Sequence, residues 1–169
     1  MATITLKGNQ IHTVGSIPSI GKTAPDFRLT KGDLSDVTLS NFGPSIKVLN
    51  IVPSLDTGVC AASARRFEKE SGQLKNVTVL TISNDLPFAM SRFCSTEGIT
   101  HVVTLSSLRD RSFGKDYGVE ISDGPMQGLL SRAVVVLDHN NKIVYSEQVP
   151  EITQEPDYSK ALDAVKKLA

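Results

Sequence analysis

The residue with the clearest chemical potential in this chain is Cys60, which follows Pro53 and Thr57 in one short stretch. Residues 48–52 form a mostly apolar, β-branched run, which predicts a buried strand. Pro53 removes a ladder donor and forces the residue before it out of the α region, so the strand is expected to end there. Thr57 is a favoured N-cap residue, and good helix formers follow it as far as Gly72. Cys60 is therefore predicted to lie in the first turn of a helix.

This position would suit a nucleophile. With Thr57 as N-cap, Cys60 is residue N3, where unpaired backbone N–H groups and the positive end of the helix dipole favour a thiolate. Asp56 is the other candidate cap, and its carboxylate would oppose a thiolate at close range, so we expect it to cap the helix or to face solvent. The alternative for Cys60 is a small buried hydrophobe, because free cysteines are among the most buried residues.

The elements that must position Cys60 follow an α/β order. Apolar runs predict strands at 3–6, 11–14, 27–30, 37–39, 48–52, 77–83, 102–105, 132–138 and 142–148. Periodicity and capping signals predict helices at 57–71, 87–94 and 158–168, with a short helix or turn at 109–117. The first two strands read as a hairpin through Gly8-Asn9, with a turn longer than two residues. The strand–helix–strand spacing around Cys60 predicts a parallel pair.

Composition narrows the class of protein. A chain of 169 residues is expected to form one domain, here residues 1–169, and its 18 basic and 18 acidic residues predict no field for nucleic acid. The N-terminus lacks the apolar core of a signal peptide, and no run is long enough to cross a bilayer, so a cytoplasmic location is expected. The two cysteines and His12, His101 and His139 lack ligand spacing, and no metal is predicted.

The stretch Pro53-x-x-x-Thr57-x-x-Cys60 resembles the peroxidatic motif of the peroxiredoxins. The resemblance extends over nearly the whole chain, through the segments around Cys94 and Arg132, and is to the bacterial thiol peroxidase subfamily, whose members are atypical two-cysteine enzymes. It implies a thioredoxin-like three-layer α/β sandwich with an added N-terminal β-hairpin. It also implies a homodimer and chemistry that needs no bound cofactor.

The resemblance assigns roles to four residues around the reaction. Cys60 attacks a hydroperoxide, Thr57 hydrogen-bonds it, Pro53 shields the site, and Arg132 projects toward Cys60, where it favours the thiolate and offers donors to the peroxide oxygens. Without the resemblance, Arg132 at the start of an apolar run would be taken as a snorkelling strand-end residue. Arg65 and Arg66 are nearer in sequence, but on a helix they are expected to be solvated.

The resemblance makes Cys94 the resolving cysteine, which forms an intrachain disulfide with Cys60 that thioredoxin reduces. Its spacing alone does not separate that role from a buried cysteine. If both cysteines begin in separate packed helices, their Cα atoms would exceed the limit of about 7 Å for a disulfide, so local unwinding is expected. A Cys-x-x-Cys oxidoreductase is disfavoured because the motif is absent. The other alternative is a peroxide-responsive redox sensor or binding module without significant turnover.

Overall fold

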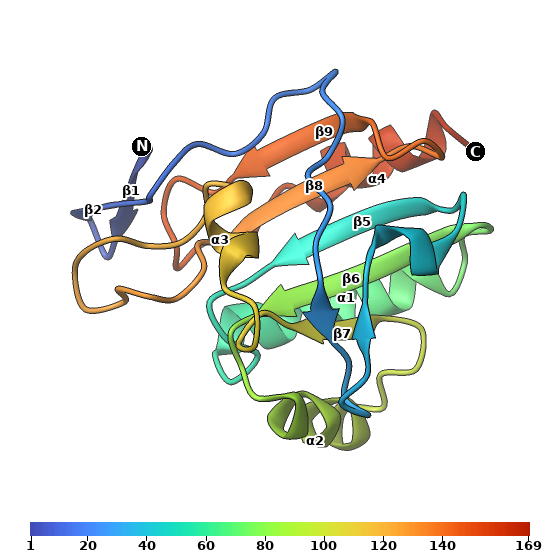
Figure 1. Ribbon diagram of the computed structural model, residues 1–169, viewed down its shortest axis with the longest axis horizontal. Helices are drawn as coiled ribbons and strands as arrows, with labels where there is room; N and C mark the ends of the chain where they lie inside the picture. The colour runs from blue at the N-terminus through green and yellow to red at the C-terminus, as the bar shows by residue number, and fades with distance from the viewer.

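The computed structural model describes residues 1–169 as one mixed sheet with helices on its faces and a separate hairpin (Figure 1). The hairpin consists of β1 (Thr3–Leu6) and β2 (Asn9–His12). The sheet strands are β3 (Leu29–Thr30), β4 (Asp36–Val37), β5 (Ile46–Ile51), β6 (Val77–Ser83), β7 (Val103–Ser106), β8 (Ala133–Leu137) and β9 (Ile143–Gln148). The helices are the 3-10 helix η1 (Leu39–Phe42), α1 (Gly58–Ser71), α2 (Pro87–Glu97), α3 (Ser112–Asp116) and α4 (Tyr158–Lys166).

The sheet is built around β5, and its strand order is β4-β3-β7-β6-β5-β8-β9. β5 is buried along its whole length, including the polar residues Lys47 and Asn50. It pairs in parallel with β6, which confirms the predicted parallel pair, and antiparallel with β8. β5 ends at Ile51, just before Val52 and Pro53, so α1 starts at the carboxyl end of the central strand.

Alternate residues of the central strands point to opposite faces of the sheet. Leu49 and Ile51 of β5 face a core that includes Phe113 of α3, and Val48 faces a second core that includes Phe67 of α1 together with residues of α4. In Figure 1, α3 lies on one side of the sheet and α1 and α4 lie on the other. The predicted thioredoxin-like three-layer sandwich is confirmed.

The N-terminal hairpin is present, but its predicted second strand and turn are wrong. β2 spans Asn9–His12 instead of 11–14, and the register pairs Leu6 with Asn9. The turn therefore contains only Lys7 and Gly8, with φ of 50° and 81°. Two successive positive φ values match the twist of paired strands. Lysine rarely adopts a positive φ, so the residue types do not predict this two-residue turn.

The other differences are changes of length. The predicted strands at 27–30 and 37–39 are reduced to two residues each, because β3 meets β7 only through Thr30 and Ser106. The strand predicted at 102–105 lies one residue later, and the segment 109–117 contains the five-residue α3. η1 was not predicted.

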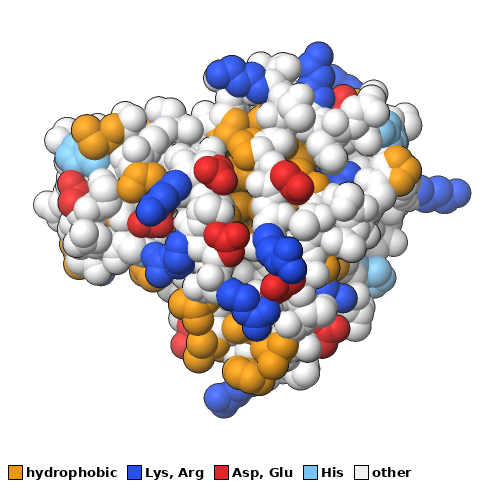
Figure 2. Space-filling view, viewed as in Figure 1, with side chains coloured by type: hydrophobic (Ala, Val, Ile, Leu, Met, Phe, Trp, Pro, Cys, Tyr) orange, Lys and Arg blue, Asp and Glu red, His pale blue; other side chains and the backbone are white.

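The surface carries both signs of charge. Figure 2 shows Lys and Arg interspersed with Asp and Glu on the face seen there, and apolar side chains gathered at the end where α2 lies. The large apolar side chains exposed at the start of α2 are Leu86 and Phe88. No helix combines the length and the apolar character that crossing a membrane requires.

Candidate active site

The first turn of α1 has the geometry that the sequence predicts. Thr57 is the N-cap, in an extended conformation, and its Oγ1 accepts a hydrogen bond from the Cys60 N–H at 3.4 Å. The same hydroxyl donates to the Ser54 carbonyl at 3.2 Å. Cys60 is therefore at N3, and Asp56 is exposed to solvent, as expected. Thr57 thus fixes both the start of α1 and the backbone of the cysteine.

Arg132 brings a positive charge to the Cys60 sulfur. It lies directly before β8, next to β5 in the sheet, and its Nη1 is 3.2 Å from Cys60 Sγ. Its Nε donates to the Ile152 carbonyl at 2.9 Å. Arg132 is only 3% exposed, so it is not the snorkelling strand-end residue of the alternative interpretation. Arg65 and Arg66 lie on the exposed side of α1, as expected.

Apolar side chains enclose the sulfur. Cys60 is fully buried and packs in a cluster with Val52, Leu55, Ala64 and Met90. Pro53, which follows Val52, is buried too. Met90 belongs to α2, so the helix that carries Cys94 also forms part of the wall around Cys60.

Cys94 lies in a different environment. It is half-buried, packs beside the core that contains Phe67, and its Sγ lies 3.8 Å from Thr104 Oγ1. Burial raises the pKa of the Cys94 thiol, the hydrogen bond with Thr104 opposes that rise, and the negative charge of Glu68 adds to it. Both cysteines are free thiols in this structure, in separate clusters and on separate helices.

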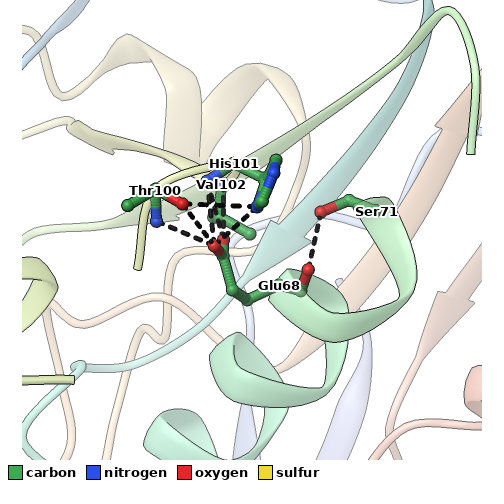
Figure 3. Close-up of polar contacts among 5 residues, drawn as sticks. All are labelled: Glu68, Ser71, Thr100, His101 and Val102. Carbon is green, nitrogen blue, oxygen red and sulfur yellow. Dashed lines mark hydrogen bonds and ion pairs between the residues drawn. The ribbon is translucent and has the colours of Figure 1, made fainter. Parts of the chain in front are cut away.

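Glu68 joins α1 to the segment that follows α2, a contact that the sequence did not predict. Its carboxylate accepts hydrogen bonds from the backbone N–H groups of Thr100, His101 and Val102 at 2.8 to 2.9 Å, and from the Thr100 hydroxyl and the His101 ring (Figure 3). Burial disfavours the charged form, but these backbone hydrogen bonds outweigh it and lower the pKa of Glu68 to about 2. A mid-helix glutamate carries no sequence signal for backbone partners in a distant loop.

A cavity of about 540 Å³ lies between the segment Ser54–Asp56 and α2. Its lining mixes apolar side chains, such as Leu55 and Phe93, with charged ones, such as Arg92 and Glu97. Neither cysteine lines it. The cavity leaves open space between the start of α1 and the face of α2.

Comparison with known proteins places the chain in a family. The Redoxin family model matches residues 19–162. The chain is 52% identical over 165 residues to a thiol peroxidase of Mycobacterium tuberculosis, covering 98% of this chain and 99% of the relative. Among solved structures, a peroxiredoxin-like protein from Aquifex aeolicus superposes with a TM-score of 0.94 at 37% identity, covering 100% of this chain and 98% of the other. A thiol peroxidase from Chromobacterium violaceum shares the fold, with a TM-score of 0.91 at 23% identity over 98% and 95% of the two chains. The chain therefore belongs to the redoxin family, in its thiol peroxidase branch.

Proposed function

We propose that this protein is a thiol-dependent peroxidase that reduces hydrogen peroxide and organic hydroperoxides. One observation carries the proposal. Arg132 is buried, forms no ion pair with a carboxylate, and has Nη1 3.2 Å from Cys60 Sγ. A buried cation without a countercharge is costly, and a thiolate at Cys60 would supply that countercharge. The site is thus arranged to hold a reactive sulfur anion.

The first step is attack of the Cys60 thiolate on the terminal oxygen of the hydroperoxide. A sulfur–oxygen bond forms, the oxygen–oxygen bond breaks, and the leaving alkoxide or hydroxide takes a proton from solvent to become alcohol or water. Cys60 is left as a sulfenic acid. Arg132 Nη2 makes no hydrogen bond within the protein, so it is free to donate to the peroxide oxygens as charge develops on them. Thr57 holds the Cys60 backbone and offers its hydroxyl, and Pro53 keeps water from the sulfur.

The second step is condensation of the Cys94 thiol with the sulfenic acid, which forms a disulfide and releases water. The two thiols lie in separate clusters and on separate helices, so we expect α2 to unwind before they meet. While α2 is folded, burial raises the pKa of the Cys94 thiol. The cavity beside α2 provides space for that movement. Unwinding also exposes Cys94 to water, which favours its reactive thiolate form.

The third step is reduction of the Cys60–Cys94 disulfide by an external dithiol, for which we propose thioredoxin. Two electrons from the dithiol restore both thiols and leave the reductant as a disulfide. The homodimer that the resemblance implies and the cytoplasmic location expected from the sequence stay predictions.

A coupled assay tests the proposal. The purified protein is supplied with hydrogen peroxide, or with cumene hydroperoxide, in the presence and absence of thioredoxin and its reductase. Peroxide consumption that continues only with thioredoxin is expected. Non-reducing peptide mapping after one equivalent of peroxide should show an intrachain Cys60–Cys94 link. Oxidation without continued consumption would indicate a sensor instead, and a Cys60–Cys60 link between chains would refute the intrachain mechanism.

A further inference from the structure

We infer that the N-terminal hairpin positions Arg132 for catalysis, through the carbonyl of Ile152, and that Glu151 fastens the hairpin to that segment. The inference rests on the proposed peroxidase function. Arg132 touches the reacting sulfur, whereas Ile152 and Glu151 act through Arg132 and are positioning residues.

The backbone of residues 150–152 lies between the hairpin and Arg132. On one side, the Thr5 N–H donates to the Pro150 carbonyl at 2.7 Å, and the Ile152 N–H donates to the Thr5 carbonyl at 2.9 Å. On the other side, the Ile152 carbonyl accepts from Arg132 Nε at 2.9 Å. One peptide segment therefore links β1 directly to the guanidinium group.

Packing holds the same segment in place. The Ile152 side chain is 2% exposed and belongs to a cluster with Ile4 and Ile11 of the hairpin and Ile121. This cluster is separate from the two cores that flank the main sheet. Because the hairpin supplies half of it, the position of Ile152 depends on the hairpin being docked.

Glu151 fastens the hairpin turn. Its carboxylate accepts hydrogen bonds from the backbone N–H groups of Lys7 and Gly8 at 2.9 and 3.1 Å, and from the Thr5 hydroxyl at 2.7 Å. It also accepts from the Thr153 hydroxyl at 2.7 Å and the Thr153 N–H at 3.2 Å. Hydrogen bonds from the hydroxyls of Thr5 and Thr153 and from the Gly8 and Lys7 N–H groups lower the pKa of Glu151. The ionised carboxylate thus joins the turn to the segment that holds Arg132.

The consequence for Arg132 follows from the shape of its side chain. A guanidinium is planar and its donors form a rigid fork, so fixing Nε sets the directions of Nη1 and Nη2 together. Nη1 then contacts Cys60 Sγ, and Nη2 stays available for the peroxide. If Ile152 moved, the fork would turn, and both contacts would be lost at once.

The test measures the rate at which peroxide oxidises Cys60 in a single turnover, beside the rate at which iodoacetamide alkylates it. Glu151→Ala should slow oxidation by roughly tenfold, because misplacing a hydrogen-bond donor to the peroxide raises the activation free energy of the attack. Alkylation should slow less, since iodoacetamide does not need the Arg132 donor to the peroxide. In an Arg132→Ala background, Glu151→Ala should have no further effect on the oxidation rate. That result would show that Glu151 affects oxidation through the position of Arg132.

Asp33→Ala is the matched control. Asp33 also accepts hydrogen bonds from a backbone N–H and a hydroxyl, both of Ser35, at 3.0 and 2.5 Å, but it lies between β3 and β4 and has no contact with the hairpin. It should leave the oxidation rate near that of the wild-type protein. Glu151→Gln keeps one carbonyl acceptor but loses the other, so it should slow oxidation by a smaller factor, roughly threefold, and it carries the test if Glu151→Ala fails to fold.

Three outcomes would overturn the inference: an unchanged oxidation rate in the Glu151 variants, an equal loss in Asp33→Ala, or an equal loss of rate in the Arg132→Ala background. Failure of the proposed function would look different. The wild-type protein itself would then show no oxidation of Cys60 by peroxide, before any variant is compared.

Discussion

The helices that carry the two cysteines are held in different ways. α1 has a side-chain N-cap at Thr57, and five of its 14 residues are buried, Cys60 among them. α2 has no side-chain cap at Leu86, and only Pro87 and Met90 among its 11 residues are buried. A segment with few buried contacts opens at a low free-energy cost, whereas a packed one does not.

This difference in burial suggests which helix moves in the proposed mechanism. There, Cys60 stays beside Arg132 for attack, and the packing of α1 favours that position. Cys94 travels, and we expect α2 to be the helix that unwinds. The far end of α2 is nevertheless anchored to α1, through the Glu68 contacts and the ion pair of Arg65 with Glu97 at 3.1 Å. We therefore expect α2 to loosen as a tethered segment and not to leave the molecule.

The largest expected effect separates the two cysteines. Cys60→Ser should reduce peroxidase activity below about one thousandth of the wild-type value, because a serine hydroxyl is not ionised near neutral pH. Cys94→Ser should still consume the first equivalent of peroxide but should stop thioredoxin-coupled turnover. Quenched-flow thiol alkylation and the coupled assay measure the two steps.

A sulfenic-acid reagent should label Cys60 in Cys94→Ser, and higher peroxide should drive it to the sulfinic form. In the wild-type protein, one equivalent of peroxide should lower hydrogen-exchange protection in α2 and leave α1 protected. Normal cycling of Cys94→Ser, or loss of protection in α1 instead, would contradict this division of roles.

The next largest effect is expected for Arg132, which contacts the Cys60 sulfur and not Cys94. Arg132→Ala should slow oxidation of Cys60 by about 100-fold, the loss typical of a preorganised donor in an active site. Quenched-flow alkylation of the Cys60 thiol that remains after mixing with peroxide measures this rate. Alkylation of Cys94 in denaturant serves as the control and should not change. An unchanged oxidation rate would mean that Arg132 is structural.

A smaller effect is expected at Glu68, where the two regions are joined. Glu68→Gln replaces a carboxylate that accepts from three backbone N–H groups, and we expect a loss of about 2 kcal/mol in the free energy of unfolding. The folded-state pKa, about 2, lies below the usual value of 4.5, so the contribution is complete above pH 4.5 and is lost as pH falls toward 2.

Denaturant unfolding between those pH values measures this contribution. The wild-type protein should lose more stability than Glu68→Gln as the pH falls, and the two should converge. Glu70→Gln, which affects only the exposed pair with Arg66, is the matched control and should behave like the wild-type protein. Parallel pH curves for the wild-type protein and Glu68→Gln would show that the carboxylate does not stabilise the fold.

The smallest effect tests whether unwinding of α2 limits disulfide formation. Ser95 and Thr96 are exposed in α2, and replacing both by alanine should stabilise that helix by about 1 kcal/mol. Formation of the Cys60–Cys94 disulfide should then slow by roughly fivefold, as followed by quenched-flow thiol alkylation. Ser159→Ala stabilises α4 instead and should leave the rate unchanged. A faster or unaltered rate in the α2 variant would contradict unwinding as the limiting event.

Local features of this protein could be predicted from the sequence because each depends on a few neighbouring residues. The end of β5 before Pro53, the cap at Thr57 and the N3 position of Cys60 were predicted correctly. The parallel pair of β5 and β6 followed from one strand–helix–strand unit. Backbone donors, capping and hydrophobic period act over a few residues, so the residue types themselves carry the information.

The tertiary structure alone decided which distant groups meet. The position of Arg132 beside Cys60 depends on the pairing and register of β5 with β8, and residues alone favoured a snorkelling arginine. The hydrogen bond from Arg132 to the Ile152 carbonyl cannot be predicted from residue types, because every residue has a backbone carbonyl. Glu68 finds its donors only where the loop before β7 passes α1. Such contacts depend on how whole elements pack and not on local preference.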